Sequence, residues 1–344
     1  EGPRFPYPLG SRRVRSAGRH PGVKFARITG TGSYLPEKIL SNRELENLLD
    51  TTDEWIYSRS GIRERHIAAD SEFTCDLAEH AARHAIESAG RKPADIDLIV
   101  VATTTPDQVF PSTACLLQNR LGIHGCPAFD VQAVCAGFIY ALDVVYRQIQ
   151  TGGSKCALVV GAETFSRILN WQDRSTCVLF GDGAGAMIVE ASDRPGILSS
   201  PLHADGAFKD LLCVPVGVST AYQEILAGRA YTEMQGKEVF KWAVTALGDA
   251  VLEALQANNC DQSEIDWLVP HQANIRIIRA IARRLDLSMD NVIVTIDRHG
   301  NTSAASIPLA FDEAVRDNRI KPGQKIIFEA FGGGFTWGSM LLEY

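Results

Sequence analysis

The sequence predicts an α/β protein built from two similar halves that pack as layers. Two continuous apolar runs, residues 96–102 and 156–162, are typical of strands buried on both faces. Helical patterns alternate with these strands, which favours layers of helices on sheets. The second half repeats the pattern weakly, since residues 264–270 resemble residues 95–101 and are again followed by strand, turn and helix.

The chain length of 344 residues accommodates two such halves. We expect residues 23–194 to form the first half and residues 195–344 the second. Residues 1–22 hold five arginines and one glutamate, a charge of +4 that leaves −11 for the rest of the chain. This leader has the composition of an organelle transit peptide or of disordered upstream sequence, and we favour the second interpretation. Its deletion is expected to leave turnover unchanged.

The composition indicates a cytoplasmic globular protein. Hydrophobic residues make up 45% and charged residues 22%, and no apolar run is long enough to span a membrane. The eight cysteines are scattered without a CxxC motif, so neither a disulfide framework nor a metal site is expected. The net charge of −7 argues against nucleic-acid binding.

The first elements follow from turn and capping signals. Residues 24–32 predict a strand that runs into a glycine turn. Ser41 and Glu44 have the spacing of a capping box, which indicates a helix start. A helix is expected over residues 74–89, and Ser112 can cap another one.

Residues 53–65 mix aromatic residues with arginines. Such a run is commonly a solvated loop with one packed tryptophan. It can also form a platform for a nucleotide, with Trp55 stacking on the base and Arg59 meeting phosphates. The glycines of residues 181–185 precede a strand and not a helix, so they do not form a dinucleotide-binding fingerprint.

The chain is organised around Cys135. Residues 129–138 read as the end of a strand, a turn, and a cysteine at the start of a helix. Residues 138–146 are apolar on nearly every face, which predicts a helix buried all round. A free cysteine is often a small core residue. A helix start, however, lowers a thiol pKa, and the small neighbours Ala136 and Gly137 leave room for a substrate.

Two polar residues in the second half complete a candidate site. His271 directly follows an apolar strand, and Asn301 lies in a turn between an expected strand, residues 292–297, and a helix over residues 303–315. Each alone is commonly a structural residue. Because ligands gather at the carboxyl ends of strands in α/β folds, we expect them to meet Cys135.

Two chemistries use this trio. A papain-like hydrolase has Cys, His and Asn in this order, and the spacing of 136 residues between Cys135 and His271 fits. The local signature around the cysteine and a secretory signal are both missing, which disfavours a hydrolase.

The second chemistry is decarboxylative condensation. A thiolate takes an acyl group from one thioester, and a malonyl thioester then loses CO2. His271 and Asn301 can donate hydrogen bonds to the enolate oxygen, and no metal is needed. The glycines of residues 332–334 can lend a backbone N–H beside that of Cys135 as an oxyanion hole, or they serve tight strand packing.

Four motifs in order, at residues 133–138, 270–274, 299–306 and 332–338, resemble those of β-ketoacyl-[acyl carrier protein] synthase III. That family initiates bacterial type II fatty acid synthesis. The resemblance covers residues 24–344 and implies a homodimer with a thiolase-like fold, αβαβα in its layers. It also implies acyl-CoA and acyl carrier protein as substrates, and no cofactor.

The resemblance further implies roles for individual residues. Cys135 would be the acylated nucleophile, His271 and Asn301 would serve decarboxylation, and the backbone of Cys135 and Gly333 would form the oxyanion hole. Phe110 would reach into the acyl pocket of a partner subunit. The coenzyme A contacts would be Trp55, Arg59, Arg174, Phe240, Asn274 and Arg276. A related ketosynthase of secondary metabolism remains an alternative, because the sequence does not reveal the acyl primer.

An arginine stripe suggests where a carrier protein docks. Asn274 can cap a helix over residues 275–285 whose outer face is basic. Such a face is commonly just solvated, but it contrasts with the acidic body of the chain and would attract an acidic carrier protein. The residues expected to bind it are Arg276, Arg279, Arg283, Arg284 and Lys241, with Lys237 as an extension.

Overall fold

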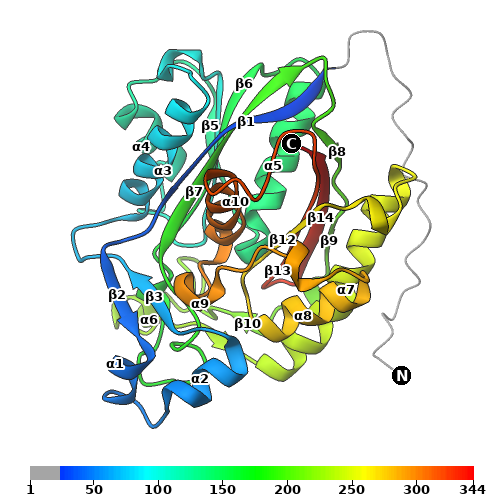
Figure 1. Ribbon diagram of the computed structural model, residues 1–344. Coiled ribbons are helices and arrows are strands. Elements are labelled where there is room, and N and C mark those ends of the chain that lie inside the picture. The colour runs from blue at the N-terminus through cyan, green and yellow to red at the C-terminus, as the bar shows by residue number, and fades with distance from the viewer. Residues whose placement is uncertain (1–23) are drawn as a thin grey trace.

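The computed structural model describes residues 24–344, in which two five-stranded sheets alternate with layers of helices (Figure 1). The first sheet has the strand order β1-β7-β6-β4-β5. Strands β4, β5 and β6 are parallel to one another, and β7 and β1 continue the sheet in antiparallel pairs. Its strands are β1 (Phe25–Tyr34), β4 (Leu98–Ala102), β5 (Ala128–Val131), β6 (Cys156–Glu163) and β7 (Gly183–Ser192).

The second sheet follows the order β12-β13-β14-β8, with β9 pairing on β14. Its β12–β13 pair is parallel and its other pairs are antiparallel. Its strands are β8 (Ile197–Ser199), β9 (Leu202–Ala204), β12 (Trp267–Pro270), β13 (Lys325–Gly332) and β14 (Thr336–Glu343). The strands of each sheet thus come from one stretch of chain, although the division into two duplicated halves at residue 194 stays a prediction.

Helices fill the space between the sheets and cover both outer faces. The central layer is α5 (Gly137–Gln150) and α10 (Ser306–Arg316), whose apolar residues form one core cluster with strands of both sheets. On the outside, α3 (Thr74–Ser88) and α4 (Thr113–Arg120) cover the first sheet. The helices α7 (Gly236–Ala257) and α8 (Ile275–Arg284) cover the second. This arrangement confirms the predicted αβαβα layering.

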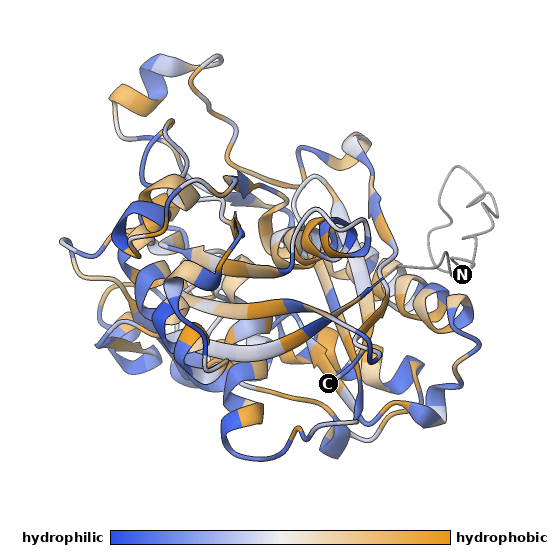
Figure 2. Ribbon diagram, turned by 90° about the horizontal axis from the view of Figure 1, so that it is seen from above, coloured by the Kyte–Doolittle hydropathy of each residue, from blue (hydrophilic) through white to orange (hydrophobic). Residues whose placement is uncertain are grey.

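Residue patterns explain these positions. No residue of α5 before Arg147 is exposed, as expected for a helix enclosed by two sheets. The outer helices instead alternate between hydrophilic and hydrophobic segments (Figure 2), because only one face of each packs on a sheet.

Smaller elements lie over one end of the layers. They include the pair β2 (Lys38–Ser41) and β3 (Glu64–Ile67), and the helices α1 (Asn42–Glu46) and α2 (Asp53–Ser60). Part of this region packs around its own apolar cluster, which includes Leu45 and Ile56. The remaining elements are β10 (Leu212–Cys213), α6 (Tyr222–Leu226), β11 (Glu233–Met234) and α9 (Ile296–His299).

Several local predictions are confirmed. Ser41 and Glu44 form the capping box of α1, Ser112 caps α4, and Asn274 caps α8. The segment around Trp55, for which a loop was one interpretation, is the helix α2 with Thr52 as its cap.

The strand expected over residues 292–297 is wrong. Only an isolated bridge joins Val292 to Leu268, and Ile296 already begins α9. The reason is the Gln272 side chain, whose Oε1 accepts the backbone N–H groups of Thr295 at 2.8 Å and Ile296 at 3.1 Å. A side chain therefore satisfies amides that a strand would have paired in a sheet.

Across residues 24–344, no helix is both long and apolar enough to cross a membrane. Within the same residues, no three His, Cys, Asp or Glu side chains gather closely enough to hold a metal ion. All eight cysteines are unpaired. The leader, residues 1–22, lies outside the described residues.

Candidate active site

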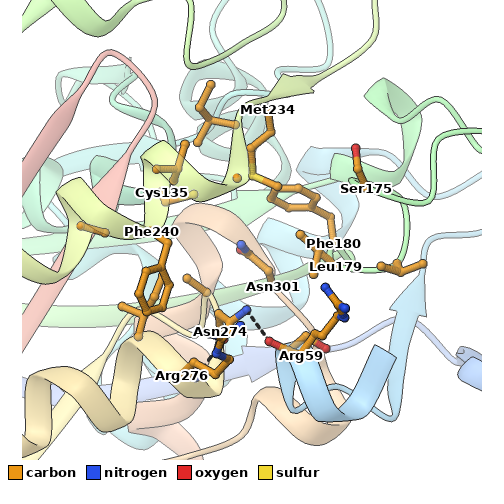
Figure 3. A pocket seen from close by; sticks show the side chains of 18 of the residues that line it. Arg59, Cys135, Ser175, Leu179, Phe180, Met234, Phe240, Asn274, Arg276 and Asn301 are labelled. Carbon is orange, nitrogen blue, oxygen red and sulfur yellow. Dashed lines mark hydrogen bonds between the residues drawn. The ribbon is translucent and has the colours of Figure 1, made fainter. Parts of the chain in front are cut away.

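Cys135, His271 and Asn301 all line one cavity of about 490 Å³. Figure 3 shows Cys135 and Asn301 among the residues that line it. Cys135 comes from the 3₁₀ turn Val134–Ala136 that leads from β5 into α5. His271 follows β12, and Asn301 lies between α9 and the 3₁₀ turn Ser303–Ala305. Three segments far apart in sequence thus bring a thiol, an imidazole and a carboxamide to one hollow.

The turn that carries Cys135 is held tightly. Val134 has a φ of 48°, which is rare for a β-branched residue and marks a locally strained backbone. Gly332 packs against this turn, since a Cβ at Gly332 would lie 2.8 Å from Cys135 N and 3.0 Å from Ala133 O. Only glycine therefore allows the end of β13 to approach the candidate nucleophile.

The expected lowering of the thiol pKa is wrong. Burial raises the pKa of Cys135 to about 12, and the nearby Glu163 carboxylate adds to this. The neighbouring Ser303 hydroxyl opposes the shift but does not reverse it. The thiol lies before the first residue of α5 in a dry interior, and desolvation of the thiolate outweighs the helix end.

His271 is neutral and oriented. Burial lowers its pKa to about 3, so the imidazole carries no charge at neutral pH. Its Nδ1 lies 2.6 Å from Ser306 Oγ, which also accepts the backbone N–H of Gln272 at 3.2 Å. If the Ser306 hydroxyl donates to Nδ1, the ring proton resides on Nε2.

Backbone hydrogen bonds to the segment before β7 hold the turn that carries Asn301. Its backbone N–H donates to Leu179 O at 2.9 Å, and its carbonyl accepts from Gly181 N at 3.0 Å. Its Oδ1 accepts the backbone N–H of Ser303 at 2.9 Å, which leaves the amide NH2 for the cavity. In Figure 3 the side-chain nitrogen points into the cavity.

All six candidate coenzyme A contacts also line this cavity. Arg59 and Arg174 both lie over the ring of Trp55, at 4.7 Å and 5.2 Å from its centroid. Arg276 lies 5.4 Å from the centre of the Phe240 ring. Flat aromatic faces with guanidinium groups above them suit a nucleotide, whose base stacks and whose phosphates are anionic.

Asn274 already has a structural task. Its Oδ1 accepts the N–H of Arg276 at 2.8 Å as the cap of α8, and its Nδ2 donates to Arg59 O at 2.9 Å, the dashed line in Figure 3. This amide joins the two helices that border the cavity mouth.

The basic residues of the proposed docking face differ in their surroundings. Arg276, Arg279 and Arg283 are exposed on α8, and among the described residues no carboxylate forms an ion pair with them. Arg284 instead pairs with Asp249 and donates to the Thr245 carbonyl at 2.9 Å. Lys241 is exposed on the neighbouring helix α7.

Two predicted residues do not line the cavity. Phe110 is 82% exposed on a loop outside it. Gly333 belongs to the β13–β14 turn, where a Cβ would lie 2.5 Å from Leu212 O.

Sequence reasoning missed the apolar wall of the cavity. Its members come from helices, from the strands β10, β11 and β13 and from the segment before β7, and they carry no reactive group that would signal a site. They include Ile56, Val178, Leu179, Phe180, Leu212, Met234, Ala243, Leu247, Ile277 and Phe331. Serines 303 and 306 were also missed, because their partners become visible only in the fold.

Comparison with known proteins decides the family. The profile described as "3-Oxoacyl-[acyl-carrier-protein (ACP)] synthase III" matches residues 129–206, and that of its C-terminal part matches residues 255–344. The chain is 69% identical over 322 residues to beta-ketoacyl-[acyl-carrier-protein] synthase III of Thioalkalivibrio sulfidiphilus, covering 94% of this chain and 100% of that one. The chain belongs to the 3-oxoacyl-[acyl-carrier-protein] synthase III family.

Solved structures agree with this assignment to the synthase III family. The synthase III of Aquifex aeolicus is 44% identical, with a TM-score of 0.88, and the match covers 93% of this chain and 100% of that one. The priming β-ketosynthase of the R1128 polyketide pathway is 37% identical, with a TM-score of 0.89 over 94% and 98% of the two chains. The resemblance read from four motifs is therefore confirmed, and the fold class with it.

Proposed function

We propose that this chain condenses a short acyl-CoA, with acetyl-CoA as the expected primer, with malonyl-[acyl carrier protein]. The product is a β-ketoacyl-[acyl carrier protein], and the reaction initiates type II fatty acid synthesis. The observation that carries the proposal is the single cavity that Cys135, His271 and Asn301 share below an aromatic and arginine-rich mouth.

In this reaction the Cys135 sulfur bonds to the acyl carbon, and coenzyme A leaves as its thiolate. Malonyl thioester then loses CO2, and its enolate attacks the acyl-Cys135 thioester. Neutral His271 suits the decarboxylation, because an Nε2–H donor stabilises the enolate oxygen without any proton transfer. The Asn301 NH2 supplies the second donor.

The proposed oxyanion hole for acyl transfer consists of the backbone N–H groups of Cys135 and Gly333. The close approach of Gly332 to Cys135 N supports it, because it brings the glycine-rich turn beside the thioester. Phe110 is proposed to enter the acyl pocket of a partner subunit in a homodimer, and its exposure is consistent with a covered position in a dimer.

The two pKa shifts disfavour the hydrolase alternative. A cysteine hydrolase depends on a thiolate beside a protonated histidine. Here burial raises the pKa of Cys135 to about 12 and lowers that of His271 to about 3, so both groups are neutral.

For the carrier protein we propose the face of α8 that bears Arg276, Arg279 and Arg283, with Lys241 and Lys237 beside it. Of the predicted set, Arg284 is the one already neutralised, by Asp249. Coenzyme A is proposed to use Trp55, Arg59, Arg174, Phe240, Asn274 and Arg276, which surround the entrance to the same cavity.

The Cys135→Ala variant tests the proposed division of labour. It is expected to lose all acyl transfer from acetyl-CoA, yet to release CO2 from a malonyl thioester, because His271 and Asn301 remain. Radiolabelled acetyl and malonyl thioesters report the two steps separately. An enzyme that releases no CO2 from malonyl thioester in any form contradicts the proposal.

A further inference from the structure

A buried carboxyl group lies behind the candidate nucleophile and outside the cavity. Glu163 ends β6, is 0% exposed, and has no cation beside it among the described residues. Burying a carboxylate this deeply is costly unless the surroundings satisfy it. Hydrogen bonds from neighbouring groups satisfy this carboxyl group, and one of them comes from Ser303.

The Glu163 oxygens accept hydrogen bonds from neutral donors on two sides. Thr105 donates from Oγ1 at 2.6 Å and from its N–H at 3.2 Å, and the Thr104 N–H lies 3.1 Å away. All these groups belong to the segment after β4. From the opposite side the Ser303 hydroxyl donates to Glu163 Oε1 at 3.1 Å.

Ser303 links this carboxyl group to the cysteine. The turns that carry Ser303 and Cys135 pack against each other, and the Ser303 hydroxyl is close enough to the Cys135 thiol to lower its pKa in part. A hydroxyl has one proton. When it points to Glu163, its oxygen can only accept from the sulfur side, which gives the chain a direction from Sγ–H to Oγ–H to Oε1.

The backbone on both sides of this contact is strained. Val134, before Cys135, and Ser303 itself both have a φ of 48°. Left-handed conformations at residues other than glycine persist where the surrounding structure enforces them, and they cluster at functional sites. The fold therefore holds the thiol and the hydroxyl in place at an energetic cost.

We infer that Glu163 accepts the proton of the Cys135 thiol through Ser303 when the acyl group is transferred. This role rests on the proposed function. The neutral His271 is a poor proton acceptor, so the thiol proton of Cys135 needs another acceptor. In this role Ser303 relays the proton from the reacting sulfur, and Glu163 acts through Ser303.

The proton balance closes over one cycle. Cys135 Sγ–H passes its proton to Ser303 Oγ while Ser303 passes its own to Glu163 Oε1. The sulfur then bonds to the acyl carbon, the carbon–sulfur bond to coenzyme A breaks, and the coenzyme A thiolate takes a proton from solvent. When the enolate attacks, the Cys135 sulfur leaves with its electron pair and regains the proton from Glu163.

Burial raises the pKa of Glu163 to about 7, against the lowering effect of its hydrogen bonds. A proton acceptor that ionises near neutral pH is well matched to such a step. The titratable group that faces Glu163 is Cys135. On the neighbouring strand β7 the residue opposite Glu163 is Gly183, which does not titrate, and the adjacent Asp182 carboxylate accepts hydrogen bonds from Ser166 and Ala68 instead. Because only the ionised Glu163 can accept a proton, the rate of acyl transfer should rise with pH as Glu163 loses its proton.

The test measures coenzyme A release from acetyl-CoA, without malonyl thioester, across pH 6 to 9. The wild-type rate is expected to rise with an apparent pKa near 7. Glu163→Gln should lose this rise and fall about 100-fold at neutral pH. The NH2 group of the glutamine would face hydrogen-bond donors, which is unfavourable whatever the role of Glu163. Ser303→Ala therefore serves as a second variant, because it keeps the carboxyl group. The double variant should be no slower than either single one, since the two residues act as a unit.

Glu329→Gln is the matched control. Glu329 is also buried, with its pKa raised to about 8 by burial, and within the described residues its hydrogen bond to the trio is made by its backbone carbonyl, which accepts the N–H of His271 at 2.8 Å and is kept in the variant. It should keep the rise of the wild type.

Malonyl decarboxylation separates a chemical role from a structural one. It should stay within about twofold of wild type in Glu163→Gln and Ser303→Ala, because it does not need the thiol. A parallel loss of decarboxylation, or an unchanged rise of acyl transfer in Glu163→Gln, overturns the inference alone. A wild-type enzyme that neither acylates Cys135 nor releases CO2 overturns the proposed function as well.

Discussion

At the scale of single residues, burial decides the chemistry of the site. The same dry environment raises the pKa of Cys135 and lowers that of His271, so two groups that could form an ion pair are both neutral. A neutral imidazole is useful here only when its proton is on the nitrogen that faces the substrate. Ser306 is the residue that can set this tautomer.

Replacing Ser306 with alanine should therefore slow malonyl decarboxylation by about tenfold. This is less than the 10²–10³ lost when an oxyanion donor itself is removed, because the imidazole remains and only its orientation and tautomer are freed. CO2 release from malonyl thioester measures the effect. Coenzyme A release from acetyl-CoA in the same variant is the control, and it should change less. Equal losses in both steps would contradict the assignment.

The trio itself could be predicted from the sequence, and its support could not. Cys135, His271 and Asn301 each stand in a recognisable motif at the end of an expected strand. Ser303, Ser306 and Glu163 are common residue types whose roles depend on what lies opposite in the fold. The helix-start argument for Cys135 also failed at this scale, because desolvation of the thiolate in the buried site outweighs the effect of the helix end on the thiol pKa.

At the scale of elements, the glycine-rich end of β13 positions the cysteine turn. Thr336 donates from Oγ1 to Ala133 O at 2.9 Å, and Gly332 packs on Cys135 N. Through these two contacts the β13–β14 hairpin of the second sheet packs on the turn that leads from the first sheet into α5.

A Gly332→Ala substitution should break this contact. The added Cβ would lie 2.8 Å from Cys135 N, which forces the turn to shift and costs about 1–3 kcal/mol of unfolding free energy. Acyl transfer should fall more than malonyl decarboxylation, because the cysteine turn moves. Gly206→Ala is the control, since a Cβ there meets no atom within 4 Å. Urea unfolding and coenzyme A release measure the two effects, and a Gly332→Ala enzyme as stable and fast as Gly206→Ala would refute the argument.

Elements were well predicted where capping residues and apolar runs define them, as at Ser41, Ser112 and Asn274. The strand expected over residues 292–297 failed for a reason invisible in its own residues. The Gln272 side chain, more than 20 positions away, takes the amides of Thr295 and Ile296. Local patterns report the strand propensity of a segment, and here the hydrogen bonds of a distant side chain outweighed that propensity.

At the scale of the whole molecule, the alternation of strands and helices was enough to predict layers. It did not reveal that β7 runs antiparallel to the other four strands of its sheet, because buried strands read alike in either direction. Charge is the other property at this scale. A chain whose residues 23–344 carry −11 presents exposed arginines on α8 beside the cavity mouth.

Reversing two of these charges should weaken the carrier-protein step alone. Arg279→Glu combined with Arg283→Glu is expected to raise the KM for malonyl-[acyl carrier protein] by about tenfold at low salt, with a smaller effect at high salt. Acyl transfer from acetyl-CoA should be unchanged, because neither residue lines the cavity. Arg194→Glu is the control, on an exposed turn after β7. An equal rise in KM for Arg194→Glu would show that only net charge matters.

The central claim is that one of eight cysteines carries the acyl group. Intact mass spectrometry after exposure to a panel of acyl-CoAs, followed by peptide mapping, tests it most directly. The account predicts one acetyl group per chain, on Cys135, and its loss when malonyl-[acyl carrier protein] is added. Labelling of another cysteine, or of none, would contradict it, and labelling by aromatic or long acyl groups alone would favour a ketosynthase of secondary metabolism.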